Sequence, residues 1–166
     1  MGSVRVQVEA FDAGAEIDAI RAGRPGVGAV AAFVGVARDV NEGARVDTMT
    51  LEHYPGMTER ALQKIADEAR ARWNLQDVTI VHRVGTLRPT EPIVLVVTAA
   101  AHRHEAFESC SYVMDYLKTE APFWKKEATA EGERWVDARE SDDRARDRWE
   151  QDPAVQVQAR ADRTGR

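Results

Sequence analysis

Two apolar runs, the second broken only by one threonine, constrain the fold of this chain more than any other feature of its sequence. The first is Gly-Ala-Val-Ala-Ala-Phe-Val-Gly-Val-Ala over residues 28–37, and the second is Ile-Val-Leu-Val-Val-Thr-Ala-Ala-Ala over residues 93–101. A strand with one face in water alternates apolar with polar side chains, and neither run does. We therefore expect the first run to be a strand buried on both faces and the second to be the strongest strand of the sheet.

Shorter patterns predict the elements around these two strands. Apolar residues at helical spacing indicate a long helix from Thr58 to about Trp73, and a second stripe over Phe107, Cys110, Met114 and Leu117 indicates another. Further elements are expected at 4–8, 12–21, 48–53, 78–84, 123–128 and 134–136. Hairpin-like connections mix with strand–helix–strand connections, which predicts an α+β fold with helices covering one side of a mixed sheet.

The size and charge of the chain limit what it can be. Its 166 residues suit a single domain, which we expect over residues 1–149, with a charged and flexible tail over residues 150–166. Hydrophobic residues make up 43%, enough for a packed core. The net charge of −5 argues against non-specific nucleic-acid binding, which needs a basic face.

Cysteine usage and hydropathy indicate a cytoplasmic protein without a membrane segment. The single cysteine, Cys110, allows no internal disulfide and no cysteine-rich zinc site, which fits a reducing compartment. No apolar run reaches membrane-spanning length, and the first residues contain no signal-peptide core. His53, His82 and His104 show no ligand spacing, so we expect no metal and no functional role for them.

The segment Tyr-Leu-Lys-Thr-Glu-Ala-Pro-Phe-Trp-Lys-Lys-Glu over residues 116–127 is the strongest functional signal. Lys118 lies at the end of an expected helix, which Pro122 stops because proline lacks the amide proton and clashes with the preceding turn. Lys125 follows the reversal directly, so both ammonium groups can be aimed at one point. The alternative is a helix end that favours cations, followed by an ordinary strand.

Three further cations also stand at the ends of predicted buried strands. Arg38 ends the first apolar run, and His102 and Arg103 lie between the second run and a helix N-terminus. Arginine supplies forked donors and a helix N-terminus supplies free amides, so this set predicts a pocket for an anionic small molecule. Each cation alone is more often a solvated turn residue. We assign Cys110, Trp73, Trp124 and Trp135 to core packing.

Six blocks of sequence between about Val4 and Asp142 match one known family. They are 28–30 with 33–38, 51–58 (Leu-Glu-His-Tyr-Pro-Gly-Met-Thr), 81–85, 101–103, 114–127 and 135–139. Together they resemble the large, catalytic subunits of molybdopterin synthase. The resemblance implies an α/β hammerhead form of the α+β fold. It also implies a sulfurtransferase that converts precursor Z, a cyclic pyranopterin monophosphate, into molybdopterin by forming its dithiolene, with no cofactor.

The resemblance also implies partners and residue roles. Sulfur arrives as a thiocarboxylate on the Gly-Gly tail of a small ubiquitin-like subunit, and two large subunits form the centre of a heterotetramer. Lys118 and Lys125 match the catalytic lysines, Arg38, His102 and Arg103 match substrate-pocket cations, and Arg139 matches an arginine from across the dimer interface. Lys118 would hold the thiocarboxylate, and Lys125 or His102 would donate a proton.

Two other functions remain open on the sequence. One is a different phosphate-ester or acyl-transfer enzyme that keeps the cation pocket but needs no protein sulfur donor. The other is a non-catalytic dimer that only docks a ubiquitin-like partner, although docking alone would not need both Lys118 and Lys125. Activity on precursor Z with a thiocarboxylated partner distinguishes all three.

Overall fold

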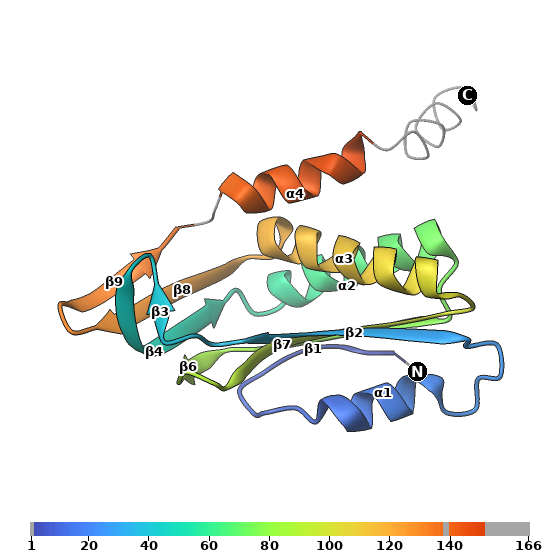
Figure 1. The fold of residues 1–166 in the computed structure, drawn as a ribbon, viewed down its shortest axis with the longest axis horizontal. Coiled ribbons are helices and arrows are strands. Elements are labelled where there is room, and N and C mark those ends of the chain that lie inside the picture. Colours follow the sequence, from blue (N-terminus) through green and yellow to red (C-terminus); the bar gives the residue numbers. More distant parts are fainter. Residues whose placement is uncertain (1, 138–139, 152–166) are drawn as a thin grey trace.

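The computed structural model describes residues 2–137 and 140–151, and these residues form two sheets and four helices (Figure 1). The predicted α+β class is confirmed. Residues 152–166, most of the expected tail, lie outside the described residues. The elements are β1 (Val4–Gln7), α1 (Ala13–Arg21), β2 (Ala29–Val36), β3 (Val40–Asn41), β4 (Ala44–His53), α2 (Met57–Trp73), β5 (Asp77–Arg83), β6 (Gly85–Leu87), β7 (Pro92–Ala100), α3 (Arg103–Glu120), β8 (Phe123–Thr129), β9 (Gly132–Val136) and α4 (Glu140–Glu150).

The first sheet is mixed and carries helices on both faces, not on one face as the sequence predicts. Its strand order is β1-β5-β7-β2, with β1 parallel to β5 and the other pairs antiparallel. Helices α2 and α3 cover one face, and α1 covers the other (Figure 1). The α1 face has its own small core, in which Ile20 packs with Val81, Leu95 and Val97. The short α1 therefore covers the face of the first sheet that the sequence pattern predicts to be without a helix.

The first apolar run lies at the edge of this sheet and is not buried on both faces. Among the strands that the structure describes, β2 pairs only with β7, and its Phe33, Val34 and Val36 side chains are 41%, 40% and 47% exposed. β7, in contrast, is buried from Val94 to Ala100, as expected for the strongest strand. The apolar character of β2 is therefore not explained by the core of a single chain.

The second sheet extends from one end of the first. Its order is β3-β4-β8-β9, and β6 also pairs with β4. β8 begins immediately after α3 ends, so the chain reverses at Ala121–Pro122, as the proline predicts (Figure 1). The Thr58 hydroxyl donates to the Pro122 carbonyl at 3.0 Å, which ties this reversal to the start of α2.

Helix α4 lies on α3 and is attached to it by its buried Trp149 and by ion pairs of Arg146 with Glu120 and of Arg148 with Asp115. The Trp149 indole donates to Asp115 Oδ2 at 2.7 Å, and its ring meets the edges of Trp73 and Tyr112 at centroid distances of 5.6 Å. Trp149 is buried by these contacts. The helix therefore belongs to the folded domain, although its sequence is highly charged.

Three aromatic side chains that the sequence assigns to the core are exposed instead. Phe107 projects from α3 into solvent, because that helix buries Ala106, Cys110 and Val113. Trp124 and Trp135 lie on the outer face of the second sheet, where Lys126 Nζ is 5.6 Å from the Trp135 ring centroid. Strand alternation explains the two tryptophans. Trp124 alternates with the pocket-lining Phe123 and Lys125 on β8, and Trp135 alternates with Arg134 and Val136 on β9.

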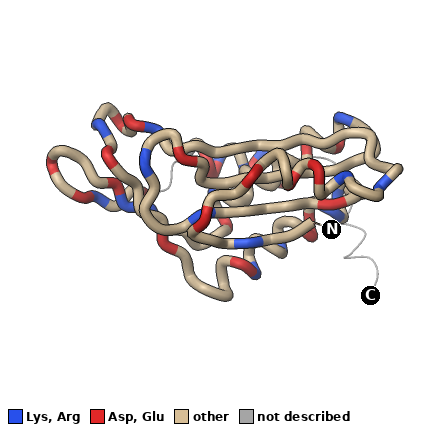
Figure 2. The backbone as a smooth tube through the Cα atoms, turned by 90° about the horizontal axis from the view of Figure 1, so that it is seen from below, with Lys and Arg blue, Asp and Glu red and all other residues tan. Residues whose placement is uncertain are grey.

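Charges of both signs are interspersed along the chain (Figure 2). Within residues 2–137 and 140–151, no helix is both long and apolar enough to cross a membrane.

Candidate functional site

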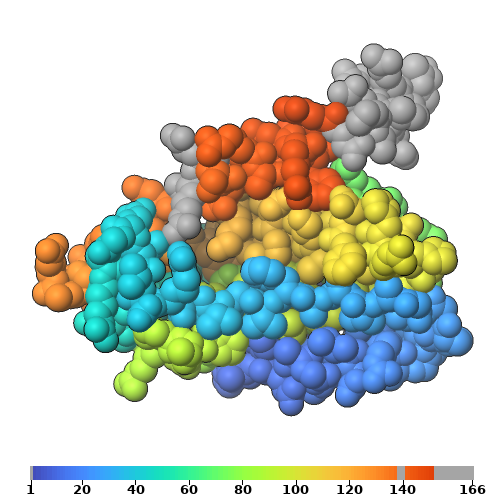
Figure 3. Space-filling view, viewed as in Figure 1, coloured from blue at the N-terminus to red at the C-terminus, as the bar shows by residue number. Residues whose placement is uncertain are grey.

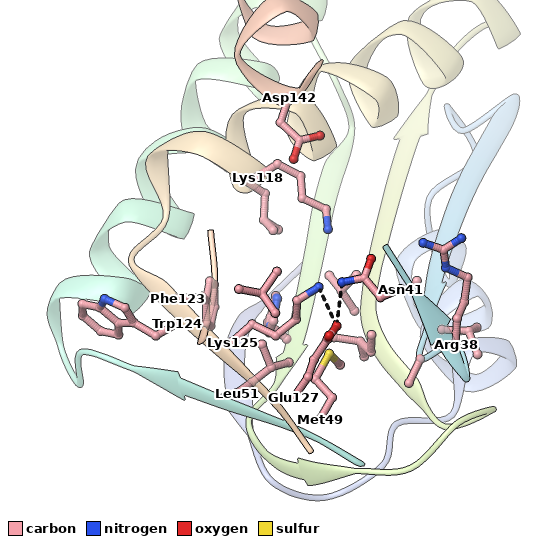
Figure 4. Close-up of a pocket in the computed structure, with 18 of the residues that line it drawn as sticks. Arg38, Asn41, Met49, Leu51, Lys118, Phe123, Trp124, Lys125, Glu127 and Asp142 are labelled. Carbon is pink, nitrogen blue, oxygen red and sulfur yellow. Dashed lines mark hydrogen bonds and ion pairs between the residues drawn. The ribbon is translucent and has the colours of Figure 1, made fainter. Parts of the chain in front are cut away.

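One pocket of about 530 Å³ lies where the end of β2, the end of α3 and the second sheet meet. Its lining includes Arg38, Lys118 and Lys125, three of the cations singled out from the sequence (Figure 4). In the space-filling view, a hollow lies between α4, the β3–β4 hairpin and β2 (Figure 3). The structure thus brings together residues that are 87 positions apart in the chain.

The two lysines reach the pocket from opposite sides of the Pro122 reversal. Lys118 lies in the last turn of α3, and Lys125 is the third residue of β8. Alternation along β8 puts Phe123, Lys125 and Glu127 on one face of the strand, and all three line the pocket. Trp124 also borders the pocket, but its ring is turned away from Lys118 and Lys125 (Figure 4). Helix, reversal and strand therefore place both ammonium groups at one cavity, as the sequence predicts.

Glu127 is a buried carboxylate at the base of the pocket that the sequence interpretation missed. Its side chain is only 3% exposed, and Lys125 Nζ lies 3.7 Å from its Oε1. Asn41 Nδ2 donates to the same oxygen at 2.8 Å, and Arg134 donates to Oε2 through Nη2 at 3.1 Å. A buried charge requires this kind of pairing to be tolerated. Glu127 thus connects β3, β8 and β9.

This network also locates Arg38. Asn41 is three residues beyond Arg38, and Arg134 Nη2 donates to the Asn41 carbonyl at 3.0 Å. The segment that carries Arg38 is therefore anchored to the pocket base through Asn41. The sequence signal for Glu127 is its position two residues after Lys125, which puts both side chains on one face of a strand.

The two lysines differ in their electrostatic surroundings. Lys125 faces the Glu127 carboxylate, whereas Lys118 forms no ion pair with any side chain in the described part of the chain. Asp142 of α4 lines the same end of the pocket as Lys118 (Figure 4). The charge of Lys118 is thus the less compensated of the two, which suits it to meet an anion.

His82 also lines the pocket, although the sequence interpretation gave it no role. It lies near the end of β5, is 5% exposed, and stacks on Phe123 with a centroid distance of 3.8 Å and an interplanar angle of 18°. Its Nδ1 is 2.8 Å from the Arg83 carbonyl. Burial lowers the pKa of His82 to about 4, so its ring is neutral at pH 7. No sequence pattern marks it, because a long-range stack creates its environment.

His102 and Arg103 do not reach this pocket within one chain. They lie at the start of α3, in a second depression with Gly28, Ala29 and His104. Lys118 is near the other end of that 18-residue helix, whose length is about 27 Å. Arg139, the remaining predicted site residue, lies outside the described residues. The single-pocket arrangement expected for all these cations is therefore not present in one chain.

The structure offers neither a thiol nucleophile nor a metal cluster in its described residues. Cys110 is buried, its Sγ faces the Val96 carbonyl at 3.9 Å, and burial raises the pKa of the thiol to about 11. It packs in the core, as expected. Within residues 2–137 and 140–151, no group of three or more His, Cys, Asp or Glu side chains could hold a metal ion.

Comparison with known proteins gives one consistent result. The family described as MoaE protein matches residues 6–120. The chain is 61% identical to the molybdopterin synthase catalytic subunit of Ralstonia nicotianae over 149 residues, which covers 90% of this chain and 85% of that protein. It is 59% identical to the molybdopterin synthase catalytic subunit of Pseudomonas aeruginosa over 149 residues, covering 90% of this chain and 99% of the other.

Solved structures agree with the sequence comparison. The molybdopterin biosynthesis MoaE protein from Burkholderia ambifaria superposes with a TM-score of 0.77 at 59% identity, covering 90% of this chain and 98% of that one. The molybdopterin synthase from Staphylococcus aureus superposes with a TM-score of 0.74 at 28% identity, covering 80% and 95%.

Proposed function

The chain belongs to the MoaE family of molybdopterin synthase catalytic subunits, and we propose that sulfur transfer to precursor Z takes place in its Lys118–Lys125 pocket. The family's activity, a sulfurtransferase step in molybdenum cofactor biosynthesis, is the activity of this chain. One observation carries the location: two lysines on either side of a forced reversal line one cavity, together with an arginine.

The different surroundings of Lys118 and Lys125 favour different roles for the two side chains in the reaction. Lys118, with no ion pair in the described part of the chain, holds the anionic thiocarboxylate and aims its sulfur at the reacting carbon of the substrate. Lys125, oriented by Glu127, donates a proton to the oxygen that leaves as the carbon–sulfur bond forms. Arg38 binds the phosphate through its forked donors. No step requires a thiol on this chain, which agrees with the buried Cys110.

The sulfur donor in this proposal is a small ubiquitin-like subunit with a Gly-Gly thiocarboxylate tail. Glycine suits a narrow channel because it lacks a side chain and allows close backbone approach. One solved structure with the same fold, from Helicobacter pylori, is a complex of two subunits of a molybdopterin-converting factor. We place this chain in the cytoplasm, and its free, buried Cys110 is consistent with a reducing compartment.

We further propose that the large subunits form a homodimer through β2, at the centre of a heterotetramer. β2 is an edge strand with exposed Phe33, Val34 and Val36, and an apolar edge invites pairing with another chain. A two-fold interface would run two β2 strands antiparallel. The start of one β2, beside His102 and Arg103, would then lie near the end of the other, beside the lysine pocket.

This arrangement accounts for the cations that one chain keeps apart. His102 and Arg103 of one protomer would complete the anion site formed by Arg38, Lys118 and Lys125 of the other. Arg139 would also act across the interface. Family membership argues against a different phosphate-ester enzyme and against a non-catalytic docking module.

Reconstitution tests this function. The chain is mixed with the thiocarboxylated small subunit and precursor Z, and molybdopterin is measured as its stable fluorescent oxidation product. We expect molybdopterin with the intact partner and none with a partner that lacks its Gly-Gly tail. Failure with the intact partner, or equal turnover with the truncated partner, contradicts the proposal.

A further inference from the structure

His82 is a buried titratable side chain of the pocket that the proposed sulfur transfer does not use. It lies on β5 opposite Val6 of β1 and Val94 of β7, so its backbone is fixed from both sides. Its ring is 5% exposed and lines the same cavity as Lys118 and Lys125. Burying the polar ring of a histidine at this depth costs free energy, which points to a defined role for the ring.

The hydrogen bond of His82 fixes its tautomer. The Arg83 carbonyl, 2.8 Å from Nδ1, can only accept, so Nδ1 carries the proton and Nε2 carries a lone pair. Burial lowers the pKa of His82, and the proximity of Lys118 and His53 lowers it further. A neutral ring with this tautomer has no proton to give at Nε2, which excludes His82 as the general acid.

The partner of the His82 ring is the residue that starts β8. The nearly parallel stack on Phe123, with centroids 3.8 Å apart, fixes that side chain against β5. Phe123 and Lys125 point from the same strand face about 7 Å apart, because side chains two residues apart lie on one side. The stack therefore sets the position from which Lys125 reaches into the pocket.

The stack also completes the anchoring of the reversal. Thr58 holds the backbone at Pro122, and His82 holds the side chain of the next residue. Lys118 lies four residues before Pro122 on one side of the reversal, and Lys125 lies three residues after it on the other. Both ammonium positions thus depend on how firmly the turn between them is held.

We propose that His82 is a positioning residue for sulfur transfer, which holds Phe123 so that Lys118 and Lys125 keep their relative placement across the pocket. The inference rests on the proposed function, because it concerns the rate of that reaction. The essential feature of His82 is its aromatic surface, and its hydrogen bond to the Arg83 carbonyl fixes the plane of its ring. An aromatic ring at position 82 should therefore keep most of the activity, whereas a small residue should not.

The test compares His82→Ala with His82→Phe in the reconstituted complex. His82→Ala should lower kcat by about 10- to 100-fold with KM for precursor Z within about twofold, because displacement of a reacting group by about 1 Å costs on that order. His82→Phe should restore kcat to within about fivefold of wild type, because it keeps the stack. Cys110→Ala, a buried change outside the pocket, should lower stability while kcat stays unchanged.

Three results would overturn the inference. One is an unchanged kcat in folded His82→Ala protein, and another is a His82→Phe variant as slow as His82→Ala. The third needs no activity: a crystal structure of His82→Ala with Phe123, Lys118 and Lys125 all in their present positions. Wild-type turnover, measured in the same assay, reports separately on the proposed function.

Discussion

At the scale of single residues, the pocket holds Lys125, which faces the Glu127 carboxylate, and Lys118, which forms no ion pair with the residues that the structure describes. Both lysines are visible in the sequence, because the Pro122 break between them is a local signal. Glu127 and Asn41 are not visible, because their meeting depends on the pairing of β3, β4 and β8, and His82 depends on a stack between β5 and β8. The reactive side chains can thus be predicted from local sequence, whereas the side chains that orient them cannot, because they come from distant parts of the chain.

Glu127→Gln should destabilise the protein and lower its activity. The amide still fits beside Asn41, but the positive charges of Lys125 and Arg134 lose their buried partner. Since Arg134 is partly exposed, we expect a loss of about 1–3 kcal/mol in the free energy of unfolding, measured by urea denaturation. The matched control is Glu133→Gln, an exposed partner of Lys126, with a change of about 0.5 kcal/mol or less. Equal effects of the two variants would contradict a role for the buried network.

Arg38→Ala should weaken the binding of precursor Z. Loss of a charged hydrogen bond to phosphate costs about 1.5–3 kcal/mol, measured by calorimetry as a roughly 10- to 150-fold increase in Kd. The control is Arg45→Ala, an exposed arginine of β4 outside the pocket lining, which should leave the affinity unchanged. Equal affinities for wild type and Arg38→Ala would remove the phosphate contact from the account.

At the scale of elements, the sequence predicts most helices and strands but not how the sheets are covered. The two long helices and the proline break rest on periodic or local signals, and they are confirmed, although Phe107 of the predicted α3 stripe is exposed. The edge position of β2 is not predictable from its composition, because an apolar strand looks the same in the centre of a sheet and at an interface. The sequence also does not predict that α1 covers the second face of the first sheet, because the apolar face of this helix is short.

Asp77, at the start of β5, bonds to residues from several elements, and these contacts predict that the free energy of unfolding depends on pH. Burial alone would raise the pKa of Asp77, but amide hydrogen bonds from Gly2 and Val78 and the guanidinium groups of Arg24 and Arg70 lower it to about 2. A carboxyl whose pKa is lower in the folded state stabilises the protein above its unfolded pKa. The contribution, about 2 kcal/mol, should be complete above about pH 4 and vanish as the pH falls toward 2.

Asp77→Asn provides the check on this pH dependence. The variant should be less stable at pH 7 and should lose less stability than wild type between about pH 4 and pH 2, measured by denaturation at each pH. Parallel curves for the two proteins over that range would show that Asp77 does not carry the acid sensitivity.

At the scale of the whole molecule, the proposed dimer explains both the exposed β2 edge and the separated cations, because it would complete each site across its interface. Within one chain, His102 and Arg103 lie at the opposite end of α3 from Lys118. The sequence predicts all these cations but cannot assign them to protomers, since the distance between them depends on the length of the folded helix.

Mixing Lys118→Ala protein with Arg103→Ala protein, each of which we expect to be strongly impaired when precursor Z is well below the Kd of the Arg103→Ala variant, tests this shared site. Lys118→Ala and Arg103→Ala protomers are combined, exchanged by unfolding and refolding, and assayed with the small subunit. If the residues act across the interface, half of the dimers are mixed and hold one intact site of two, which gives about a quarter of wild-type activity. Activity no higher than that of the parent variants would place both residues in the same protomer's site.

Molybdopterin formation by the Lys118→Ala variant shows whether Lys118 supplies the charge for sulfur transfer. Lys64→Ala, which removes an exposed lysine of α2, is the matched control. We expect a folded Lys118→Ala protein that binds the small subunit but turns over at least about 100-fold more slowly, while Lys64→Ala keeps the wild-type rate. Turnover of folded Lys118→Ala protein at the rate of Lys64→Ala would exclude Lys118 from the sulfur-transfer step.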